Sequence, residues 1–206
     1  MIVKNGNFNG LRYKVAYPNT FTKSNKYPVL FFFHGAGERG NDLDLLDVHG
    51  IFKQIKEGDE FDFICISPQC EENIVWFDML SIIKEFIIDF IQDDYVDKSH
   101  VLLSGISMGG YMSWQLLMSL PEVFSKAVIC CGGGMYWNAE RIKAKVWAFH
   151  GKCDDVVYAD ESIKMVNAIN TSNGSARLTL FDNIGHDCWT KVFNNPEVYK
   201  WLIKVD

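Results

Sequence analysis

The sequence predicts one α/β domain, in which a mostly parallel sheet is covered by helices on both faces. Short, continuous apolar runs such as residues 29–33 (VLFFF) are typical of strands buried on both faces of a parallel sheet. Segments with apolar residues at helical spacing lie between these runs, most clearly at residues 82–91. The alternation indicates parallel βαβ units, and no repeat, low-complexity segment or linker divides residues 1–206.

The remaining elements follow from the same two patterns. Residues 11–17 alternate apolar and polar side chains and end at Pro18, which favours a strand near a sheet edge. Pro196 suits the first turn of a closing helix. We expect strands at residues 11–17, 29–33, 63–67, 101–104, 126–131, 146–150 and 177–181, and helices at about residues 45–55, 82–91, 108–119, 160–170 and 196–204.

Composition and charge exclude several classes of partner. The formal net charge is −6 and no basic run is present, so a nucleic-acid partner is not expected. The N-terminus has no apolar run of signal-peptide length, and residues 29–33 are far too short to cross a bilayer. We therefore expect a cytoplasmic protein with no membrane partner, while the sequence gives no indication of an oligomeric state.

The six cysteines indicate neither a disulfide framework nor a metal site. None of them forms a Cys-x-x-Cys pair, and three lie in apolar, strand-like runs. Free, buried thiols are therefore expected. The sequence implies no metal and no organic cofactor.

The stretch at residues 101–110 (VLLSGISMGG) carries the first candidate for chemistry. Ser107 stands between Gly105 and Gly109, after a run of strand character and before a segment compatible with a helix. A serine in such a sharp strand-to-helix turn has its hydroxyl raised at the carboxyl end of the strand, within reach of a base. The alternative is a chance Gly-x-Ser-x-Gly match in a loop, which the flanking strand and helix patterns disfavour.

A serine nucleophile needs a base, and His186 is the histidine that fits. In a strand–elbow–helix arrangement the expected chain order is serine, acid, histidine, each at a strand end. His186 follows the expected strand at residues 177–181. The other histidines fit worse, because two end buried strands directly before a glycine and two precede the serine out of order: His34, His150, His49 and His100.

The acid that orients this base is expected at Asp154. It follows the expected strand at residues 146–150 and is the first carboxylate able to point back toward His186 after the short turn. Asp155 is the nearest alternative, and Asp182 is a more distant one.

Two backbone N–H groups are expected to stabilise an oxyanion. One belongs to Met108, the residue after the nucleophile. The other is assigned to Ala36, in the glycine-rich turn at residues 34–41. A phosphate-binding loop is the alternative for this turn, but it has neither the P-loop lysine nor a Gly-x-Gly-x-x-Gly spacing.

Four blocks of the sequence carry a family resemblance: residues 34–40 (HGAGERG), residues 105–110 (GISMGG), residues 147–151 (WAFHG) with Asp154, and residues 185–187 (GHD) with Trp189. Together they resemble α/β-hydrolase serine esterases of the group that spans dienelactone-hydrolase-like proteins, phospholipase/carboxylesterases, and feruloyl and acetylxylan esterases. Proteins near this pattern are also called predicted peptidases or polyhydroxybutyrate-depolymerase-like esterases. The resemblance covers essentially the whole chain in order. It implies an α/β-hydrolase fold and a serine hydrolase that acts on carboxylic esters.

One departure from the family pattern disfavours dienelactone hydrolase activity, because dienelactone hydrolases proper use a cysteine where this chain has Ser107. Only about a dozen residues separate the strands that end near residue 131 and begin near residue 146, which leaves no room for a helical lid. The expected substrate is therefore a small-molecule or carbohydrate ester with a short acyl group, or an ester on a larger polymer. A thioesterase or peptidase with the same triad is the alternative, and a non-catalytic binding protein is less favoured.

Aromatic residues are expected at the cleft, where stacked rings suit a sugar or a phenolic acid. Trp76 and Trp189 are the candidates for substrate binding, and Arg39 is a candidate contact for a charged substrate. Simple packing of the rings, or an ion pair between Glu38 and Arg39, is the alternative interpretation. Three further aromatic residues lie at plausible cleft positions: Phe77, Tyr136 and Trp137.

Overall fold

The computed structural model describes residues 1–204 and contains one eight-stranded sheet with the order β1-β2-β4-β3-β5-β6-β7-β8. The pairs β1–β2 and β2–β4 are antiparallel, and all the other neighbouring strands are parallel. The strands are β1 (Ile2–Phe8), β2 (Leu11–Tyr17), β3 (Tyr27–Phe33), β4 (Ile64–Pro68), β5 (Val96–Ile106), β6 (Lys126–Cys130), β7 (Lys145–Gly151) and β8 (Ala176–Phe181).

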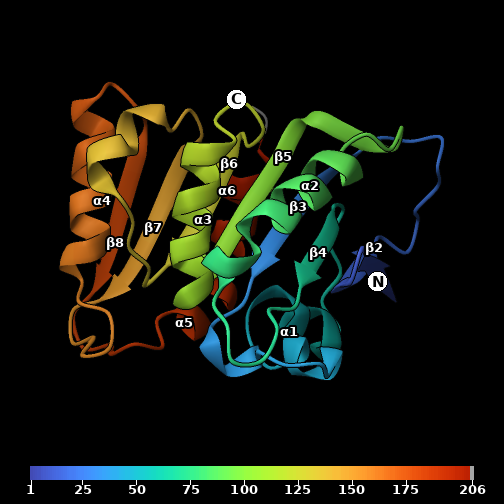
Figure 1. Cartoon of the computed structure of the whole chain (residues 1–206), viewed down its shortest axis with the longest axis horizontal. Helices are drawn as coiled ribbons and strands as arrows, with labels where there is room; N and C mark the ends of the chain where they lie inside the picture. Colours follow the sequence, from blue (N-terminus) through green and yellow to red (C-terminus); the bar gives the residue numbers. More distant parts are fainter. Residues whose placement is uncertain (205–206) are drawn as a thin grey trace.

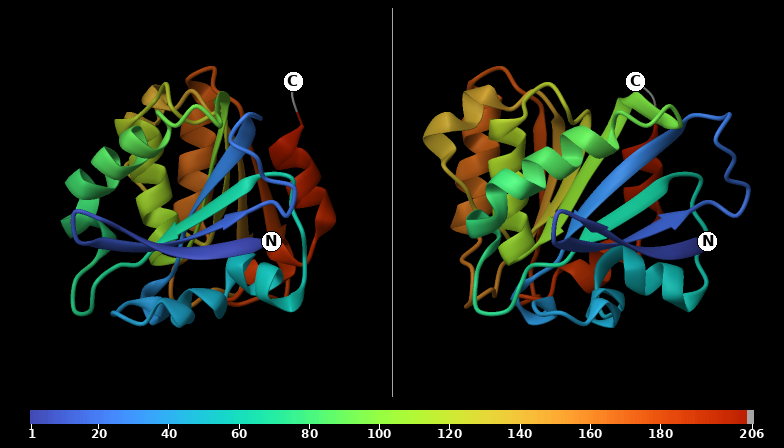
Figure 2. Two further views of the ribbon diagram at one scale, coloured as in Figure 1. Left: turned by 90° about the vertical axis from the view of Figure 1, so that its right-hand side faces the viewer. Right: turned by 45° about the vertical axis from the view of Figure 1, so that its right-hand side comes forward.

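Helices cover both faces of the sheet, as the sequence predicts. Figure 1 shows α2, α3 and α4 in front of the strands, and the left view of Figure 2 shows the sheet nearly edge-on with α6 on the opposite side from α2. The α-helices are α1 (Gly50–Glu57), α2 (Leu80–Phe90), α3 (Met108–Ser119), α4 (Asp160–Thr171), α5 (Trp189–Phe193) and α6 (Pro196–Ile203). Short 3-10 helices occur at η1 (Ala36–Glu38), η2 (Leu43–Asp47), η3 (Trp76–Met79) and η4 (Tyr136–Arg141).

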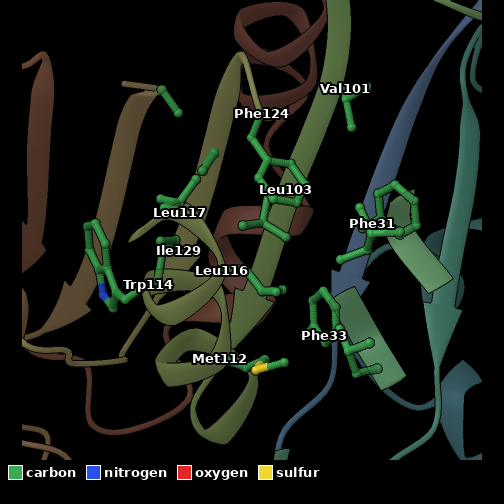
Figure 3. Packing of buried hydrophobic residues seen from close by; sticks show 14 of the residues in the cluster. Phe31, Phe33, Val101, Leu103, Met112, Trp114, Leu116, Leu117, Phe124 and Ile129 are labelled. Atoms are coloured by element: carbon green, nitrogen blue, oxygen red, sulfur yellow. The ribbon is translucent and has the colours of Figure 1, made fainter. Parts of the chain in front are cut away.

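The continuous apolar run of β3 reflects burial on both faces. Phe31 and Phe33 point into the core under α2 and α3, whereas Leu30 and Phe32 point into the core under α1, α5 and α6. Figure 3 shows Phe31 and Phe33 beside the side chains that α3 and β5 contribute to the first core. Side chains alternate across a strand, so both core layers need apolar residues from the same strand.

The structure contains an N-terminal hairpin that we did not predict from the sequence. Strand β1 is mostly polar and exposed, so it lacks the apolar pattern on which the other strands were recognised. It pairs with β2 through Asn9 and Gly10, which have positive φ values of 50° and 97°. Such a two-residue Asn-Gly turn matches the twist of a hairpin, and the turn was the available sequence signal.

The expected helix at residues 45–55 is wrong in its first half. The structure has η2 up to Asp47 and a separate helix, α1, that begins at Gly50 with φ 66°. The ring of Phe32 fills the space that a Cβ at Gly50 would need, which fixes the break at this position. The short helices η4 and α5 were also not expected.

The cysteines agree with the prediction, since all six are free and five of them are buried. No helix within residues 1–204 has both the length and the apolar character needed to cross a membrane.

Replacement of Phe31 by alanine tests the first core. Phe31 is fully buried and makes edge-on ring contacts with Phe86, Phe90 and Phe124. We expect Phe31→Ala to lower the free energy of unfolding by about 3–5 kcal/mol in urea denaturation, because it leaves a cavity in a packed core. The matched change Phe77→Ala, at a ring that is 50% exposed, should cost less than about 1 kcal/mol. Equal losses in the two variants would contradict this packing.

Candidate active site

Ser107 occupies the sharp turn between β5 and α3. Its backbone has φ 51° and ψ −118°, a positive φ that residues other than glycine rarely adopt. A Cβ at Gly109 would overlap the carbonyl oxygens of Phe33 and His34, and a Cβ at Gly105 would overlap the carbonyl of Gly109. The two glycines therefore let α3 begin directly against the ends of β3 and β5, and this close packing holds the serine in its strained turn.

The side chains of Ser107, His186 and Asp154 form one hydrogen-bonded chain at the carboxyl edge of the sheet. Ser107 Oγ lies 2.8 Å from His186 Nε2, and His186 Nδ1 lies 2.8 Å from Asp154 Oδ2. Because an ionised carboxylate only accepts hydrogen bonds, Nδ1 carries the proton and Nε2 is left to accept the serine proton. The arrangement gives the serine a base and gives the base an orienting group.

Asp154 is buried, and the turn after β7 holds its carboxylate. Oδ1 accepts hydrogen bonds from the backbone N–H groups of Val156 and Val157, each at 2.9 Å. Burial alone would raise the pKa of this carboxyl, but the hydrogen bonds from His186 and the two amides outweigh it and hold the pKa below its usual value. Asp155 is exposed, and Asp182 forms an ion pair with Lys152 instead of approaching His186.

His150 is a second histidine at this carboxylate, and the sequence reading missed its contact with Asp154. Its Nε2 lies 2.8 Å from the carbonyl oxygen of Val157 and 3.2 Å from Asp154 Oδ2. Its Nδ1 lies 2.8 Å from Ser162 Oγ, which in turn donates to the carbonyl of Gly132 at 3.1 Å. The ring therefore bonds to the backbone and also connects the end of β7 to α4 and to the loop after β6.

The two expected oxyanion donors lie at helix N-termini on either side of Ser107. Met108 is the first residue of α3 and Ala36 is the first residue of η1, so neither N–H has an acceptor within its own helix. A Cβ at Gly35 would lie 3.6 Å from Ser107 Cβ, which shows that the loop after β3 packs against the nucleophile.

Two residues predicted to contact substrate make hydrogen bonds that brace this loop, and their contact with substrate stays a prediction. Trp76 is only 1% exposed, and its Nε1 donates to the carbonyl of His34 at 3.0 Å. Arg39 donates from Nε to the carbonyl of Ala36 and from a terminal nitrogen to the carbonyl of Ile74, at 2.9 and 3.1 Å. Both side chains therefore contribute to the shape of the site by fixing the segment that carries Ala36.

Trp189 lies against the base itself. Its ring meets the His186 imidazole edge-on, with 5.3 Å between centroids, and its other side meets His49 at 5.5 Å. Glu38 is buried between His34 and His49, with an oxygen 3.6 Å from each ring, and does not pair with Arg39. Burial raises the pKa of Glu38, but the neighbouring imidazoles of His34 and His49 outweigh it and lower the pKa.

The thiol of Cys131 lies beside the acid and the base. One potential ligand atom each from Cys131, Asp154 and His186 falls within 4.8 Å of the others. Burial raises the pKa of the Cys131 thiol, so this group is a neutral neighbour of the carboxylate. The thiolate that a metal would need is therefore disfavoured here.

A cavity of about 300 Å³ opens directly at the serine. Of the aromatic residues expected at the cleft, Trp76 and Phe77 line it, whereas Tyr136 and Trp137 lie exposed on η4. Tyr111, one turn along α3 from Ser107, completes the aromatic part of the wall and was not anticipated. The space next to the nucleophile is thus predominantly apolar.

The sequence of the chain matches the model of a known protein family. The family model described as phospholipase/carboxylesterase matches residues 20–202. The chain belongs to the phospholipase/carboxylesterase family. The family model covers the whole stretch that contains Ser107, Asp154 and His186.

Individual relatives include both esterases and peptidases. A solved thermostable esterase superposes with a TM-score of 0.80 at 28% identity, over 98% of this chain and 62% of that protein. The dipeptidyl-peptidase 5 of Aspergillus fumigatus is 28% identical in an alignment 159 positions long that covers 69% of this chain and 21% of that protein. Thermogutta terrifontis esterase 2, solved phosphorylated by paraoxon, shares the fold with a TM-score of 0.74 at 14% identity, over 98% of this chain and 89% of that protein. The chain thus spans about a fifth of the curated relative.

The lowered pKa of Asp154 predicts a pH-dependent contribution to stability. A carboxyl with a folded pKa below its unfolded value of about 3.9 stabilises the folded state above that pH, and the stabilisation is lost as pH falls through the folded pKa. The difference in unfolding free energy between the unmodified protein and Asp154→Asn should therefore shrink as the pH is lowered below about 4. Urea denaturation of both proteins at a series of pH values measures this difference in unfolding free energy. The neighbouring exposed change Asp155→Asn should show no such trend, and a constant difference for Asp154→Asn would count against the proposed hydrogen bonding.

Proposed function

We propose that this member of the phospholipase/carboxylesterase family is a serine hydrolase that cleaves carboxylic esters through an acyl-enzyme. The hydrogen-bonded chain from Ser107 through His186 to Asp154 carries the proposal. A strained serine, a base with a free Nε2 and a buried carboxylate supply the nucleophile, the proton acceptor and the group that stabilises the charged imidazole.

The reaction follows from this geometry. Ser107 Oγ attacks the ester carbonyl carbon while His186 Nε2 takes the hydroxyl proton, and the carbonyl oxygen becomes an oxyanion that accepts from the N–H groups of Met108 and Ala36. The tetrahedral intermediate collapses, the carbon–oxygen bond to the alcohol breaks, and His186 returns the proton to the departing alcohol. Water then attacks the acyl-enzyme with the same base, and this step releases the carboxylic acid and regenerates the Ser107 hydroxyl.

Esters are the favoured substrates for two reasons. The family model is described as phospholipase/carboxylesterase, and the 28% identical solved relative is an esterase. The segment between β6 and β7 also forms only the short helix η4 rather than an inserted lid, which leaves the apolar cavity at Ser107 accessible.

A peptidase activity is the second candidate, and one observation favours it. The Aspergillus fumigatus relative is a dipeptidyl-peptidase, although this chain spans only 21% of it. The same three catalytic groups serve esters, thioesters and amides, so the triad does not choose between them. Matched ester, thioester and peptide substrates with a common acyl group would separate the candidates by kcat/KM.

An active-site-directed fluorophosphonate tests the triad directly. We expect covalent labelling of Ser107, located by mass spectrometry, and loss of that labelling in His186→Ala because the hydroxyl then lacks its base. Ser107→Ala should lower kcat for ester hydrolysis by at least about a thousandfold, with the fold intact by circular dichroism.

Two results would speak against the proposal. Folded protein that is not labelled would indicate an unassembled oxyanion site and favour a binding protein. Ester turnover that survives undiminished in Ser107→Ala would remove the serine from the reaction. The variant Ser104→Ala, at a buried hydroxyl that donates to the carbonyl of Val128, serves as the matched control and should remain labelled at Ser107.

A further inference from the structure

Three adjoining cavities form a groove that starts at the nucleophile and runs along α3. The cavity at Ser107 shares Phe77 and Tyr111 with a second one of about 470 Å³. The second shares Gln115, Met118 and Met135 with a third of about 380 Å³. We call this continuous depression the α3 groove.

The floor of the α3 groove comes from α3, and its walls come from η3, α2 and η4. The floor is one face of α3, since Ser107, Tyr111, Gln115 and Ser119 repeat every four residues. At 1.5 Å per residue, this face extends for roughly 18 Å. The walls are one face of η3 and α2 on one side, with Phe77, Leu80 and Lys84, and η4 with its preceding loop on the other, with Met135, Asn138 and Arg141. Figure 1 shows α2 and α3 on the same face of the sheet.

Most of the side chains that line the first two cavities of the groove are apolar. Val75, Phe77 and Met108 surround the serine end, and Leu80, Met118 and Met135 continue beyond Tyr111. Phe77 remains 50% exposed although it stands at the junction of two cavities. A row of apolar side chains that leads away from a nucleophile fits an apolar part of the substrate rather than a sugar ring.

The far end of the groove has the opposite character. Lys84 and Arg141 line the third cavity together with Gln115, Ser119 and Asn138. Arg141 is fixed there because its Nε donates to the carbonyl of Met118 at 3.0 Å. Within residues 1–204, neither cation has a carboxylate at ion-pair distance.

One carboxylate lines the middle of the groove and sets the register of a charged ligand. Glu161 of α4 borders the second cavity and pairs with Lys164 at 3.7 Å. Its negative charge disfavours an anion at that depth, while Lys84 and Arg141 favour one at the far end.

We propose that the α3 groove binds the part of the substrate beyond the scissile bond, and that this part is an apolar chain that ends in an anionic group. The inference rests on the proposed ester hydrolysis and names its substrate class: an ester with a long apolar segment between the reacting carbonyl and a terminal carboxylate or phosphate. It differs from the short acyl group expected from the sequence.

Two pairs of ligands of equal chain length test the proposal. Methyl decanoate and monomethyl sebacate place a ten-carbon chain on the acyl side, and decyl acetate and the acetate ester of ω-hydroxydecanoate place it on the alcohol side. Binding to Ser107→Ala by titration calorimetry needs no turnover, and KM with the unmodified protein provides the second measurement. One pair carries its chain on the side of the ester that occupies the groove. In that pair, we expect the anionic member to bind roughly fivefold more tightly than the neutral one.

The double variant Lys84→Gln/Arg141→Gln should bind the anionic and the neutral member equally. A second variant, Gln115→Trp, should obstruct the groove and so raise the ratio of KM for the long-chain ester to KM for methyl acetate. Lys23→Gln, an exposed lysine in the loop between β2 and β3, is the control and should leave both ratios unchanged. No preference for the anionic member in either pair overturns the groove assignment, even if Ser107 is labelled by fluorophosphonate. Preferential binding without hydrolysis of any ester instead overturns the proposed function and retains the groove as a binding site.

Discussion

The close approach of α3 to the ends of β3 and β5 is the constraint on which the site depends. Gly109 lies against the last carbonyls of β3, and Gly105 lies under the first turn of α3, where Ser113 Oγ also donates to the carbonyl of Gly109 at 2.8 Å. Any side chain at either glycine would push the helix away from the sheet. The loop that holds Ala36 packs against Ser107, because a Cβ at Gly35 would lie 3.6 Å from the Cβ of Ser107. The proposed nucleophile and the proposed oxyanion donors therefore depend on neighbouring packing contacts.

A second network, of hydrogen bonds around His150, positions the carboxylate of Asp154. His150 contacts Asp154 and Val157 from the end of β7, and Ser162 connects the same ring to the backbone of Gly132. Buried polar groups are costly unless they are paired, so a chain of satisfied hydrogen bonds gives this region a single arrangement. The Asp154 carboxylate is thus held by main-chain amides and by a histidine that does not itself meet the serine.

The sequence predicted those features that follow from periodicity and from chain order. The parallel strands were recognisable because burial on both faces requires continuous apolar runs such as residues 29–33. Ser107, Asp154 and His186 were recognisable because each follows such a strand, and parallel strands end at one edge of the sheet. These are local patterns with a direct spatial consequence.

Some features that the sequence did not predict lack an apolar pattern, and others depend on contacts between distant segments. Strand β1 has almost no buried face, so pairing with β2 rather than apolar pattern defines it. The break before α1 lies at Gly50, where a side chain would overlap the ring of Phe32. Phe32 belongs to β3, which is distant in the chain. Trp76 and Arg39 were assigned to substrate by residue type alone. The structure adds hydrogen bonds from both side chains to backbone carbonyls, at His34 for Trp76 and at Ala36 and Ile74 for Arg39.

The wide sequence separation of the triad has a consequence for the synthesis of the protein. Ser107 and His186 are 79 residues apart, and His186 and Asp154 are 32 apart, so the site closes only through non-local contacts. A nascent chain emerges from its N-terminus, and it carries the nucleophile well before β8 and the loop that bears His186. In the proposed mechanism, Ser107 has no base until that loop emerges and β8 pairs with β7. The hydroxyl therefore acquires its proton acceptor only late in the synthesis of the chain.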